Sequence, residues 1–599
     1  MINAARFRGL IFSSFVLLLS GPAFGQANDA LSNDSVANAI IANTSASDEY
    51  VEWRVLSDTD ANLYREIFAL QENGSWKAAD KKIANLENDI LLGYVQFQRY
   101  MHPTAYRSSF TELKRWMAFY ADHPEAQKVY SLASRRRPKG YSSPRRWTSR
   151  KWRQGPAREF HPDLEADYAR KGRSRVKRIE GRVRHLSNRE KASTALKEID
   201  RHLKRGTITT RQYDRMRSWI AASFYYQGYV DTARRISNQA ANRSGDTAVL
   251  SYWIAGLIAF RDGNIEDAHR LFDRMAKVTY QEDSLRSAAG FWASRTALLA
   301  NRADNVVAPL NIAAQYPFTF YGQLALAQLG RDPGFDWDRA IVTRDGLAKL
   351  TATTPRINRA IALTQAGRAS DADTELRWAN GEITDQLDYD LLAIAQQLDL
   401  PSAQLDIALL GNAKYLEAGL FPIPEFSPAD GFKVDRALIY ALMRQESKFK
   451  TDATSRVGAR GLMQLMPRTA SWVARDRSLQ RRGRKGRDRL YDPGFNLSLG
   501  QKYVNQLIDA HVDGNVFHLA AAYNGGPGNL SRWRREVAID DPLLFIESIP
   551  SRESRDFVEK VLTNFWVYRA RLGQSAPTRD KVAAGELPVY EALDQIAGE

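Results

Sequence analysis

A single carboxylate stands at the end of an apolar helical pattern in the last third of this 599-residue chain. Apolar residues recur at i, i+3, i+4, i+7 and i+8, the spacing of one face of an α-helix, at Val434, Ala437, Leu438, Ala441 and Leu442. Glu446 follows them. A carboxyl group at the end of a buried helix can have the raised pKa that a general acid needs at neutral pH. Because most glutamates in such positions are solvated or ion-paired, the position alone does not establish catalysis.

Three further motifs follow Glu446-Ser447 in the chain. They are Gly-Leu-Met-Gln at 461–464, Ala-Tyr-Asn-Gly-Gly-Pro-Gly at 522–528 and Ile-Glu-Ser-Ile-Pro at 546–550. In this order and spacing, the set resembles the catalytic domain of the soluble lytic transglycosylases, lysozyme-like enzymes that cut the glycan strands of bacterial peptidoglycan. The resemblance is strong over about residues 425–572 and only architectural over 50–416.

The resemblance implies a reaction with one catalytic carboxylate. Glu446 would protonate the glycosidic oxygen between N-acetylmuramic acid and N-acetylglucosamine, and the substrate's own N-acetyl oxygen would stabilise the anomeric carbon. Glu446 would then take the proton of the C6 hydroxyl, which closes on C1 to give a 1,6-anhydro product. No water is consumed, so the enzyme would be a lyase. One residue can act as acid and then as base because the first step leaves it ionised.

The resemblance also implies a set of substrate-binding residues. Ser455 and Gln464 match polar positions that orient sugar groups, and Met466 matches a position at the cleft. Tyr523 should hydrogen-bond near Glu446 or the N-acetyl group, Asn524 should order its turn, and Glu547 matches a position associated with peptide-stem contact. For Glu547 a plain salt bridge is nearly as good an interpretation. For Met463 we prefer packing in the core.

Two residues depart from the family pattern. Gly525 stands where the family usually has Ala, which should loosen the loop without changing the chemistry. Phe557 stands where the final helix usually has Tyr, so any hydroxyl contributed there is missing.

Two other functions stay open. A lysozyme-type hydrolase of the same glycan would need a second carboxylate or a positioned water. Alternatively, the helical region before the motifs could be the functional part, as a non-catalytic periplasmic scaffold. Intact Glu446, Gln464 and Tyr523 argue against the scaffold.

Composition limits the partners and the chemistry. The net charge of +16 and the pI near 9.7 favour an anionic partner. The chain has no cysteine, which excludes disulfides and cysteine-based metal or redox chemistry. Its eight histidines form no His-x-x-x-His pair beside a carboxylate, so we expect no metal site, and we expect no cofactor.

The N-terminus predicts the compartment. Arg6 and Arg8 precede a short apolar run over 10–19, and the small residues of 22–25 suit cleavage before Gln26. The run is too short to span a membrane comfortably. We therefore expect a signal peptide over 1–25, a soluble periplasmic protein without stable membrane insertion, and a disordered leader over 26–48.

Helical signals without strand signals dominate residues 49–416. A Gly-x4-Ala pattern starts at Gly74, Gly228, Gly263 and Gly367, and the middle two are 35 residues apart. A glycine turn followed by a small residue where two helices touch is typical of repeated helix pairs. The predicted fold is therefore mostly α-helical: an α-superhelical domain over 49–416, with a linker-like subdomain near 360–416, then a lysozyme-like domain over 417–575 and a polar tail over 576–599.

Two basic stretches interrupt this pattern. The first is a predicted loop over 134–160 in which Arg and Lys alternate with Trp, and the second runs over 475–489. Such a composition can bind nucleic acid, but the signal peptide argues against that partner. We expect the glycan strands of peptidoglycan as the main partner, no nucleic acid, and either plain solvent exposure or contact with an anionic surface through 135–153 and 481–489.

Overall fold

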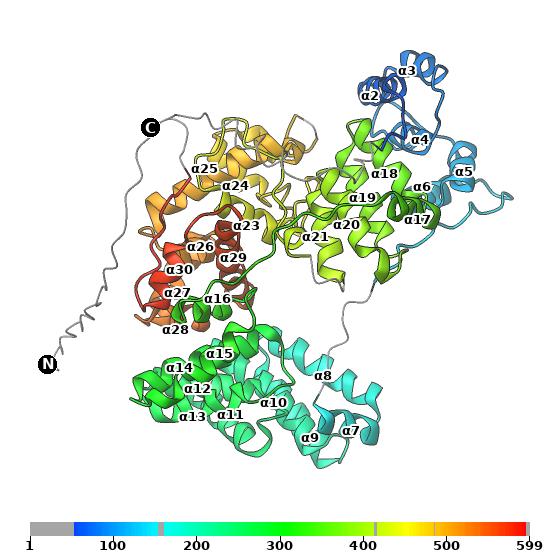
Figure 1. The fold of residues 1–599 in the computed structure, drawn as a ribbon. Helices are drawn as coiled ribbons and strands as arrows, with labels where there is room; N and C mark the ends of the chain where they lie inside the picture. The colour runs from blue at the N-terminus through cyan, green and yellow to red at the C-terminus, as the bar shows by residue number, and fades with distance from the viewer. Residues whose placement is uncertain (1–52, 154–160, 412–415, 484, 595–599) are drawn as a thin grey trace, which may run out of the picture. The chain divides into compact units, whose positions relative to one another are not determined.

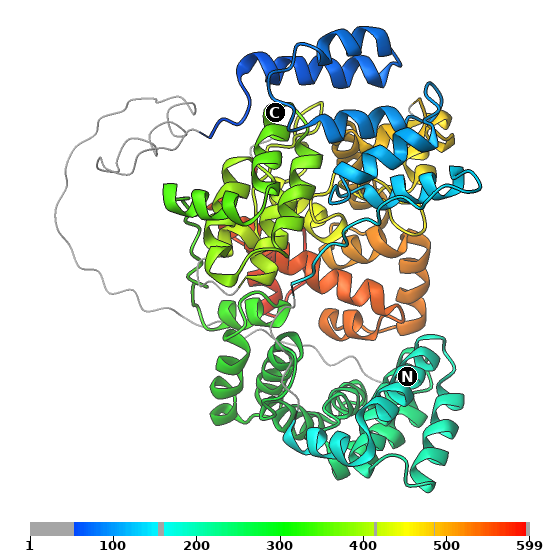
Figure 2. The ribbon, with the colours of Figure 1, turned by 90° about the vertical axis from the view of Figure 1, so that its right-hand side faces the viewer.

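Helices joined by loops make up the computed structural model of the chain (Figures 1 and 2). It describes residues 53–153, 161–411, 416–483 and 485–594, which all lie in one unit that begins at Trp53. The predicted signal peptide and leader lie outside the described residues, as do 154–160 of the first basic stretch and residue 484 of the second. The described residues contain isolated β-bridges and no β-strand, which confirms the predicted mostly helical fold class.

The helices fall into four runs along the chain. The first comprises α2 Asp58–Glu72, α3 Trp76–Ile83, α4 Leu92–Tyr100, α5 Phe110–Phe119 and α6 Ala126–Arg136. The second comprises α7 Pro162–Lys171, α8 Arg173–Asn188, α9 Ala192–Lys204, α10 Thr210–Tyr226, α11 Val230–Ser244, α12 Leu250–Arg261, α13 Ile265–Ala276, α14 Asp283–Leu299, α15 Val307–Ala314 and α16 Phe320–Gln328. The third comprises α17 Arg344–Thr353, α18 Arg356–Gln365, α19 Ala369–Ala379, α20 Asp388–Gln397, α21 Pro401–Leu410 and α22 Glu417–Leu420.

The fourth run carries the motifs. It comprises α23 Arg436–Glu446, α24 Pro467–Ala474, α25 Pro493–His511, α26 Val516–Gly525, α27 Pro527–Val537, α28 Pro542–Ser548, α29 Arg552–Arg571 and α30 Pro577–Ala583. Short 3₁₀ turns add η1 Ala303–Asn305, η2 Asp385–Leu387, η3 Arg477–Gln480 and η4 Arg487–Tyr491. Within the described ranges, none of these helices is long and apolar enough to cross a membrane.

The Gly-x4-Ala pattern marks the turns of four helix pairs. Each glycine has a positive φ, between +71° and +83°, which favours glycine because it has no Cβ. Each alanine is fully buried, five residues later, where the two helices of the pair meet: Ala79, Ala233, Ala268 and Ala372. The pairs are α2/α3, α10/α11, α12/α13 and α18/α19. The repeat inferred from the sequence is confirmed at the level of these turns.

The expected superhelical region contributes to two large hydrophobic cores and to two smaller clusters. One core joins α2 and α4 to residues 342–416, so the two ends of the region pack together across the sequence (Figure 1). The other joins α8–α16 to the residues of the fourth run. The segment near 360–416 therefore does not act as a linker, because buried residues of α18–α21 form much of the first core.

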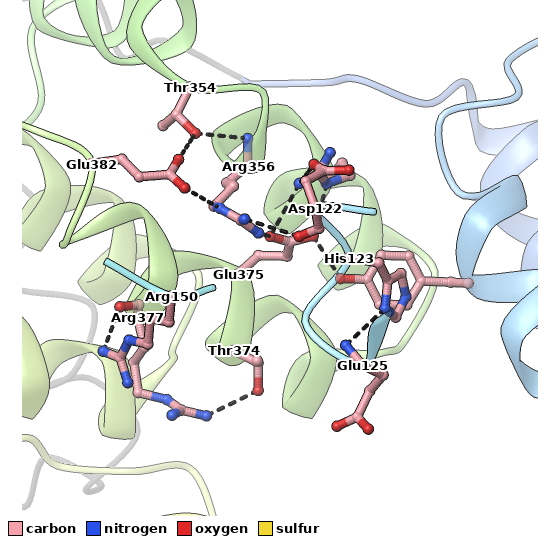
Figure 3. A network of polar contacts seen from close by, with 12 residues as sticks. Asp122, His123, Glu125, Arg150, Thr354, Arg356, Thr374, Glu375, Arg377 and Glu382 are labelled. Atoms are coloured by element: carbon pink, nitrogen blue, oxygen red, sulfur yellow. Dashed lines mark hydrogen bonds and ion pairs between the residues drawn. The ribbon is translucent and has the colours of Figure 1, made fainter. Parts of the chain in front are cut away.

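A buried ion-pair network fastens the first run of helices to the third (Figure 3). Glu375 on α19 accepts from Arg356 and Arg359 on α18 at 2.5 and 2.7 Å, and from the Tyr94 hydroxyl at 2.6 Å. The two guanidinium groups lower the pKa of Glu375 against the effect of burial. Arg356 also donates to the carbonyl of Asp122, and Arg359 pairs with its carboxylate at 2.9 Å. Buried charges with several partners are costly to disrupt one at a time, so this joint is rigid.

The second run meets the fourth through polar contacts as well as the shared core. The Tyr225 hydroxyl of α10 lies 2.8 Å from Ser548 Oγ, and Arg295 of α14 pairs with Asp541. The Tyr321 hydroxyl of α16 donates to the Glu547 carboxylate. These contacts place α28 against the second run.

The segment expected to be a polar tail is instead folded onto the fourth run. It contains α30 and a β-bridge between Asn515 and Val589. The amides of Leu593 and Asp594 donate to Asp435, the residue that precedes α23, at 2.8 Å. Asp435 is buried and pairs with Arg569 at 2.7 Å, so the last described residues help to fix the start of α23.

Candidate active site

Glu446 is the last residue of α23, a helix that is buried on every side. All seven residues from Ala437 to Met443 are buried, not only those of the predicted apolar face. The helix packs against α29. The two turns that precede Glu446 are therefore packed in the core, which positions the backbone of Glu446 at the end of a buried helix.

The chain reverses direction directly after Glu446. Lys448 and Phe449 both have φ in the left-handed region, at +52° and +63°, which costs energy for residues with a side chain. The Phe449 side chain is buried, which offsets part of that cost. Ser447 Oγ donates back to the Met443 carbonyl at 3.2 Å, the local bonding expected for it.

The next loop is held by its own backbone. Bridges join Thr454 to Arg460 and Arg460 to Leu465. Gly461 has φ +74°, and a Cβ there would lie 2.1 Å from the Leu490 carbonyl oxygen, so only glycine fits. Asn496 of α25 fastens this loop, accepting from the Met463 amide at 2.8 Å and donating to the Arg460 carbonyl at 3.1 Å. Met463 is fully buried, which confirms its interpretation as a core residue.

Burial sets the protonation of Glu446. Burial, with a smaller contribution from the negative charge of Glu553 on α29, raises the pKa of Glu446 to about 8. Among the described residues, no hydrogen bond or ion pair reaches the Glu446 carboxylate. The side chain keeps partial exposure. Glu446 therefore holds a proton at neutral pH that is available to an outside acceptor.

Tyr523 lies within electrostatic reach of Glu446. Burial raises the pKa of the Tyr523 phenol strongly, and the Glu446 charge raises it further. Its hydroxyl donates to the Met463 carbonyl at 2.8 Å, which ties α26 to the Gly-Leu-Met-Gln loop. Its ring stacks on Phe557 at 6.2 Å between centroids and lies 5.5 Å from the ring of Tyr503. The hydroxyl is therefore bonded to the loop, and its link to Glu446 is electrostatic.

Ser455, Gln464 and Met466 lie on the loop that follows Glu446. Ser455 Oγ accepts from the Ala459 amide at 3.0 Å, and the Gln464 Nε2 group donates to the carbonyls of Ala453 and Gly461. The nitrogen end of Gln464 is thus used within the loop, and its Oε1 atom is the end that can accept from a ligand. Met466 precedes α24 and is 39% exposed, as a residue at a cleft surface would be.

Asn524 and Glu547 have partners inside the protein. Asn524 Oδ1 accepts from Ser554 Oγ at 2.7 Å, which ties the end of α26 to the start of α29. Glu547 is buried on α28 and accepts from Tyr321. Burial raises the pKa of Glu547 to about 7, although Tyr321 and Arg555 act to lower it. Asn524 thus joins α26 to α29, whereas Glu547 faces the second run of helices.

Glu553 is a residue that sequence reasoning missed. It lies in the first turn of α29, is exposed, and is the charge that acts on Glu446. It also lines a cavity of about 2370 Å³ between the second run and α28–α29, and Glu547 lines the same cavity. Nothing in the local sequence marks Glu553, because a glutamate in the first helical turn is a common feature of any helix.

Across the part of the chain that the structure describes, no cluster of three or more His, Asp or Glu side chains has the arrangement needed to hold a metal ion.

Comparison with known proteins identifies the fourth run. The sequence model of the family described as the transglycosylase SLT domain matches residues 425–544. The soluble lytic murein transglycosylases of Salmonella typhimurium and Escherichia coli K12 are 34% and 35% identical over 145 and 144 residues. Each of these alignments covers 24% of this chain and 22% of the relative, so the sequence similarity spans about a fifth of their length.

Solved structures extend the likeness to the fold. The 70-kDa soluble lytic transglycosylase of Escherichia coli matches with a TM-score of 0.54 and 17% identity, covering 86% of this chain and 97% of that protein. The same 70-kDa enzyme type in complex with bulgecin A matches with a TM-score of 0.56 and 16% identity, covering 90% and 99%. At this identity the match shows the fold. The chain therefore contains a region that matches the transglycosylase SLT domain, and its overall fold is similar to that of the 70-kDa soluble lytic transglycosylase.

Proposed function

We propose that this chain is a lytic transglycosylase that cleaves the β-1,4 bond between N-acetylmuramic acid and N-acetylglucosamine in peptidoglycan. The observation on which the proposal rests is Glu446, a carboxyl group with a pKa near 8, no internal partner among the described residues, and a phenol within electrostatic reach. The relatives that share the SLT domain are named for activity on murein.

In this proposal Glu446 acts first as acid and then as base. Its proton goes to the glycosidic oxygen as the bond to C1 breaks. The substrate's N-acetyl oxygen stabilises the cation at C1, and the Tyr523 phenol helps to orient this group. The ionised Glu446 then takes the proton of the C6 hydroxyl, whose oxygen bonds C1 to form the 1,6-anhydro ring. No proton is gained or lost overall, and no cofactor is needed.

The remaining assignments belong to the same proposal. Ser455, Gln464, Met466, Tyr523 and Asn524 form or support the sugar site, and Glu547 is retained as a weaker candidate for stem-peptide contact. The division into a superhelical part before residue 416 and a lysozyme-like part from 417 is part of the proposal, as is a periplasmic location after removal of residues 1–25.

A second candidate function is a hydrolase of the same bond. Glu553 favours it, because a hydrolase of this kind uses two carboxylates and Glu553 is a second carboxylate within electrostatic reach of Glu446. The other nearby acids are less suitable: Asp492 Oδ1 caps α25 by accepting from the Phe495 amide, and Asp452 is an exposed turn residue. The third possibility, a scaffold without activity, predicts no product at all.

Digestion of purified peptidoglycan separates the three functions. The chain and its Glu446→Gln variant are incubated with sacculi, and the released muropeptides are weighed. Anhydro-terminated products from the parent alone support the transglycosylase and its acid/base. Products heavier by one water, with reducing ends, support the hydrolase, and Glu553→Gln is then tested for loss of activity. Absence of products from both proteins would overturn the proposal in favour of a scaffold.

A further inference from the structure

The described part of the first basic stretch, residues 134–153, starts in the last turn of α6 and has no part in the chemistry above. Between residues 105 and 153 the sequence has thirteen basic and three acidic residues. The three acids are already engaged: Glu112 by Tyr106 and Ser109, Asp122 by Arg359, and Glu125 by Lys128. The positive charge of this region is therefore not neutralised within its own segment.

Three arginines anchor the stretch to the protein. Arg136 donates to Ser108. Arg150 donates to the Arg377 carbonyl at 2.6 Å and pairs with Asp406 at 2.8 Å, as Figure 3 shows in part. Arg153 pairs with Asp385 and Asp388. These anchors bond to α19–α21, to η2 and to the loop before α5, so residues 137–153 are attached to the protein although they form no helix or strand.

Six further cations of the stretch are exposed to solvent. Arg135, Arg137, Lys139, Arg145, Arg146 and Lys151 are all exposed. Among the described residues, none of the six has a carboxylate within ion-pair distance. Arg137 and Arg145 donate only to the neutral oxygens of Ser143 and Ala118. We call these six side chains the basic patch.

Exposed aromatic rings accompany the basic patch. Phe119, at the end of α5, is 69% exposed, Tyr141 is 57% exposed and Trp152 is 71% exposed. The Arg145 bond to the Ala118 carbonyl brings the patch next to Phe119, and Arg150 lies over the Trp152 ring at 4.1 Å. By contrast, Trp147 is partly buried against Tyr130 at 5.0 Å. The three outer rings touch Tyr120, Phe110 and Arg150 on one side, yet each leaves more than half of its surface exposed, which is unusual for large hydrophobic side chains grouped on one face.

We propose that the basic patch and its three outer rings bind an anionic phospholipid surface. Cations attract the phosphate groups within about a Debye length, and aromatic rings favour the boundary between headgroups and acyl chains. A phenylalanine exposed at the end of a helix gains from such a boundary and offers no hydrogen bond to a polar polymer.

The composition disfavours a glycan as the ligand of the patch. Residues 134–153 contain no Asp, Glu, Asn or Gln, the side chains whose planar oxygens and amides pair with sugar hydroxyls. A surface that binds sugar rings would need such groups beside its tryptophan. The inference concerns attachment of the chain to a lipid surface, so its test is independent of the catalytic proposal.

Vesicle sedimentation tests the inference. The chain from Gln26 is mixed with phosphatidylcholine vesicles that do or do not contain phosphatidylglycerol. We expect binding only to the anionic vesicles, with weakening as salt shortens the Debye length from about 10 Å at 0.1 M to about 3 Å at 1 M. A triple variant, Arg135→Glu, Lys139→Glu and Lys151→Glu, should bind them at least about tenfold more weakly, since each cation near an anionic surface contributes to attraction. These three side chains form no bond within the described residues, so folding should be unaffected.

A matched control changes the same net charge elsewhere. Arg178→Glu, Lys197→Glu and Arg235→Glu lie on exposed faces of α8, α9 and α11, and this variant should keep most of the vesicle binding. The double variant Phe119→Ala and Trp152→Ala should bind anionic vesicles several-fold more weakly. If both charge variants lost vesicle binding equally, net charge alone would explain the binding and the inference would be overturned. The inference would also be overturned if the patch variant bound anionic vesicles normally but lost binding to purified sacculi or to duplex DNA, because the patch would then be a site for those polymers.

Discussion

Glu446 and Glu547 are two carboxylates of the same region that burial perturbs in the same direction. The pKa of Glu446 rises to about 8 and that of Glu547 to about 7. Their partners differ. Glu547 accepts from Tyr321 and faces the guanidinium of Arg555, both of which oppose the rise. Glu446 has only the repulsion of Glu553 in addition to burial. A raised pKa therefore does not by itself identify a catalytic acid; the absence of internal partners distinguishes Glu446.

The largest expected difference between the two glutamates is in activity. Glu446→Gln should reduce the release of soluble muropeptides by about 10³- to 10⁴-fold, because it removes both the acid and the base. Glu547→Gln should retain activity within about threefold, since its carboxylate already has a partner on α16. Thermal unfolding of both variants checks that they are folded. Equal losses of activity would mean that Glu547 also acts on the substrate.

Tyr523 tests whether the surroundings of Glu446 matter beyond burial. Tyr523→Phe should lower kcat by about 10- to 100-fold, as removal of a preorganised hydroxyl does at other charge-stabilising sites. Tyr503→Phe is the matched control, because its ring lies beside Tyr523 and its hydroxyl has no assigned role. A loss of similar size in both variants would indicate disturbed packing of the three rings rather than a specific hydroxyl.

The two carboxylates also show what the sequence could and could not predict. The end of α23, the loop at Gly461 and the four Gly-x4-Ala turns follow from local periodicity and from backbone conformations that only glycine adopts easily. These features were predicted from the sequence alone.

Contacts between distant segments were not predictable in the same way. Tyr321 precedes Glu547 by 226 residues, and no local pattern pairs them. No local pattern predicts that residues 342–416 pack on α2 and α4, where the sequence indicated only a linker-like subdomain. Nor does one predict that Asp435 accepts from Leu593, in the segment expected to be a tail. Glu553 was missed for the same reason: its charge acts on Glu446 only because α29 packs against α23.

The pH dependence of the free energy of unfolding should also differ between Glu446 and Glu547. Since the folded pKa of Glu446 is above its unfolded value, the folded state binds a proton more tightly, and stability falls as pH rises from about 4.3 towards 8. The Glu446→Gln variant cannot ionise at this position, so its free energy of unfolding should exceed that of the parent by up to about 4 kcal/mol at pH 8 and by little at pH 4. Thermal melts at the two pH values measure this.

Glu547→Gln should behave differently in the same melts. This variant also avoids the free-energy cost of ionising a buried carboxyl group at high pH. Its amide, however, is a weaker acceptor for the Tyr321 hydroxyl than a carboxylate, and this loss offsets the gain in stability. We expect a stability change within about 1 kcal/mol at pH 8. A gain as large as that of Glu446→Gln would show that the Tyr321 bond adds little.

Glu553 connects electrostatics to the pH profile of the reaction. Its charge raises the pKa of Glu446, so Glu553→Gln should lower that pKa and move the alkaline limb of the activity profile to lower pH. Because Glu553 is exposed, the shift should shrink as salt screens the two charges. At pH 6, where Glu446 stays protonated in both proteins, activity should agree within a few-fold. An unchanged limb would mean that burial alone sets the pKa.

Phe557 gives the smallest expected effect and tests whether a departure from the family pattern matters. The ring is buried and stacks on Tyr523 with an interplanar angle of 7°. Phe557→Tyr restores the usual hydroxyl but must find a partner for it, and an unsatisfied buried hydroxyl costs about 1–3 kcal/mol. We expect activity within about threefold of the parent, together with a lower Tm, measured by muropeptide release and thermal melts. A gain in activity above that range would show that the missing hydroxyl belongs to the site of Glu446, because the ring stack itself is the same in both proteins.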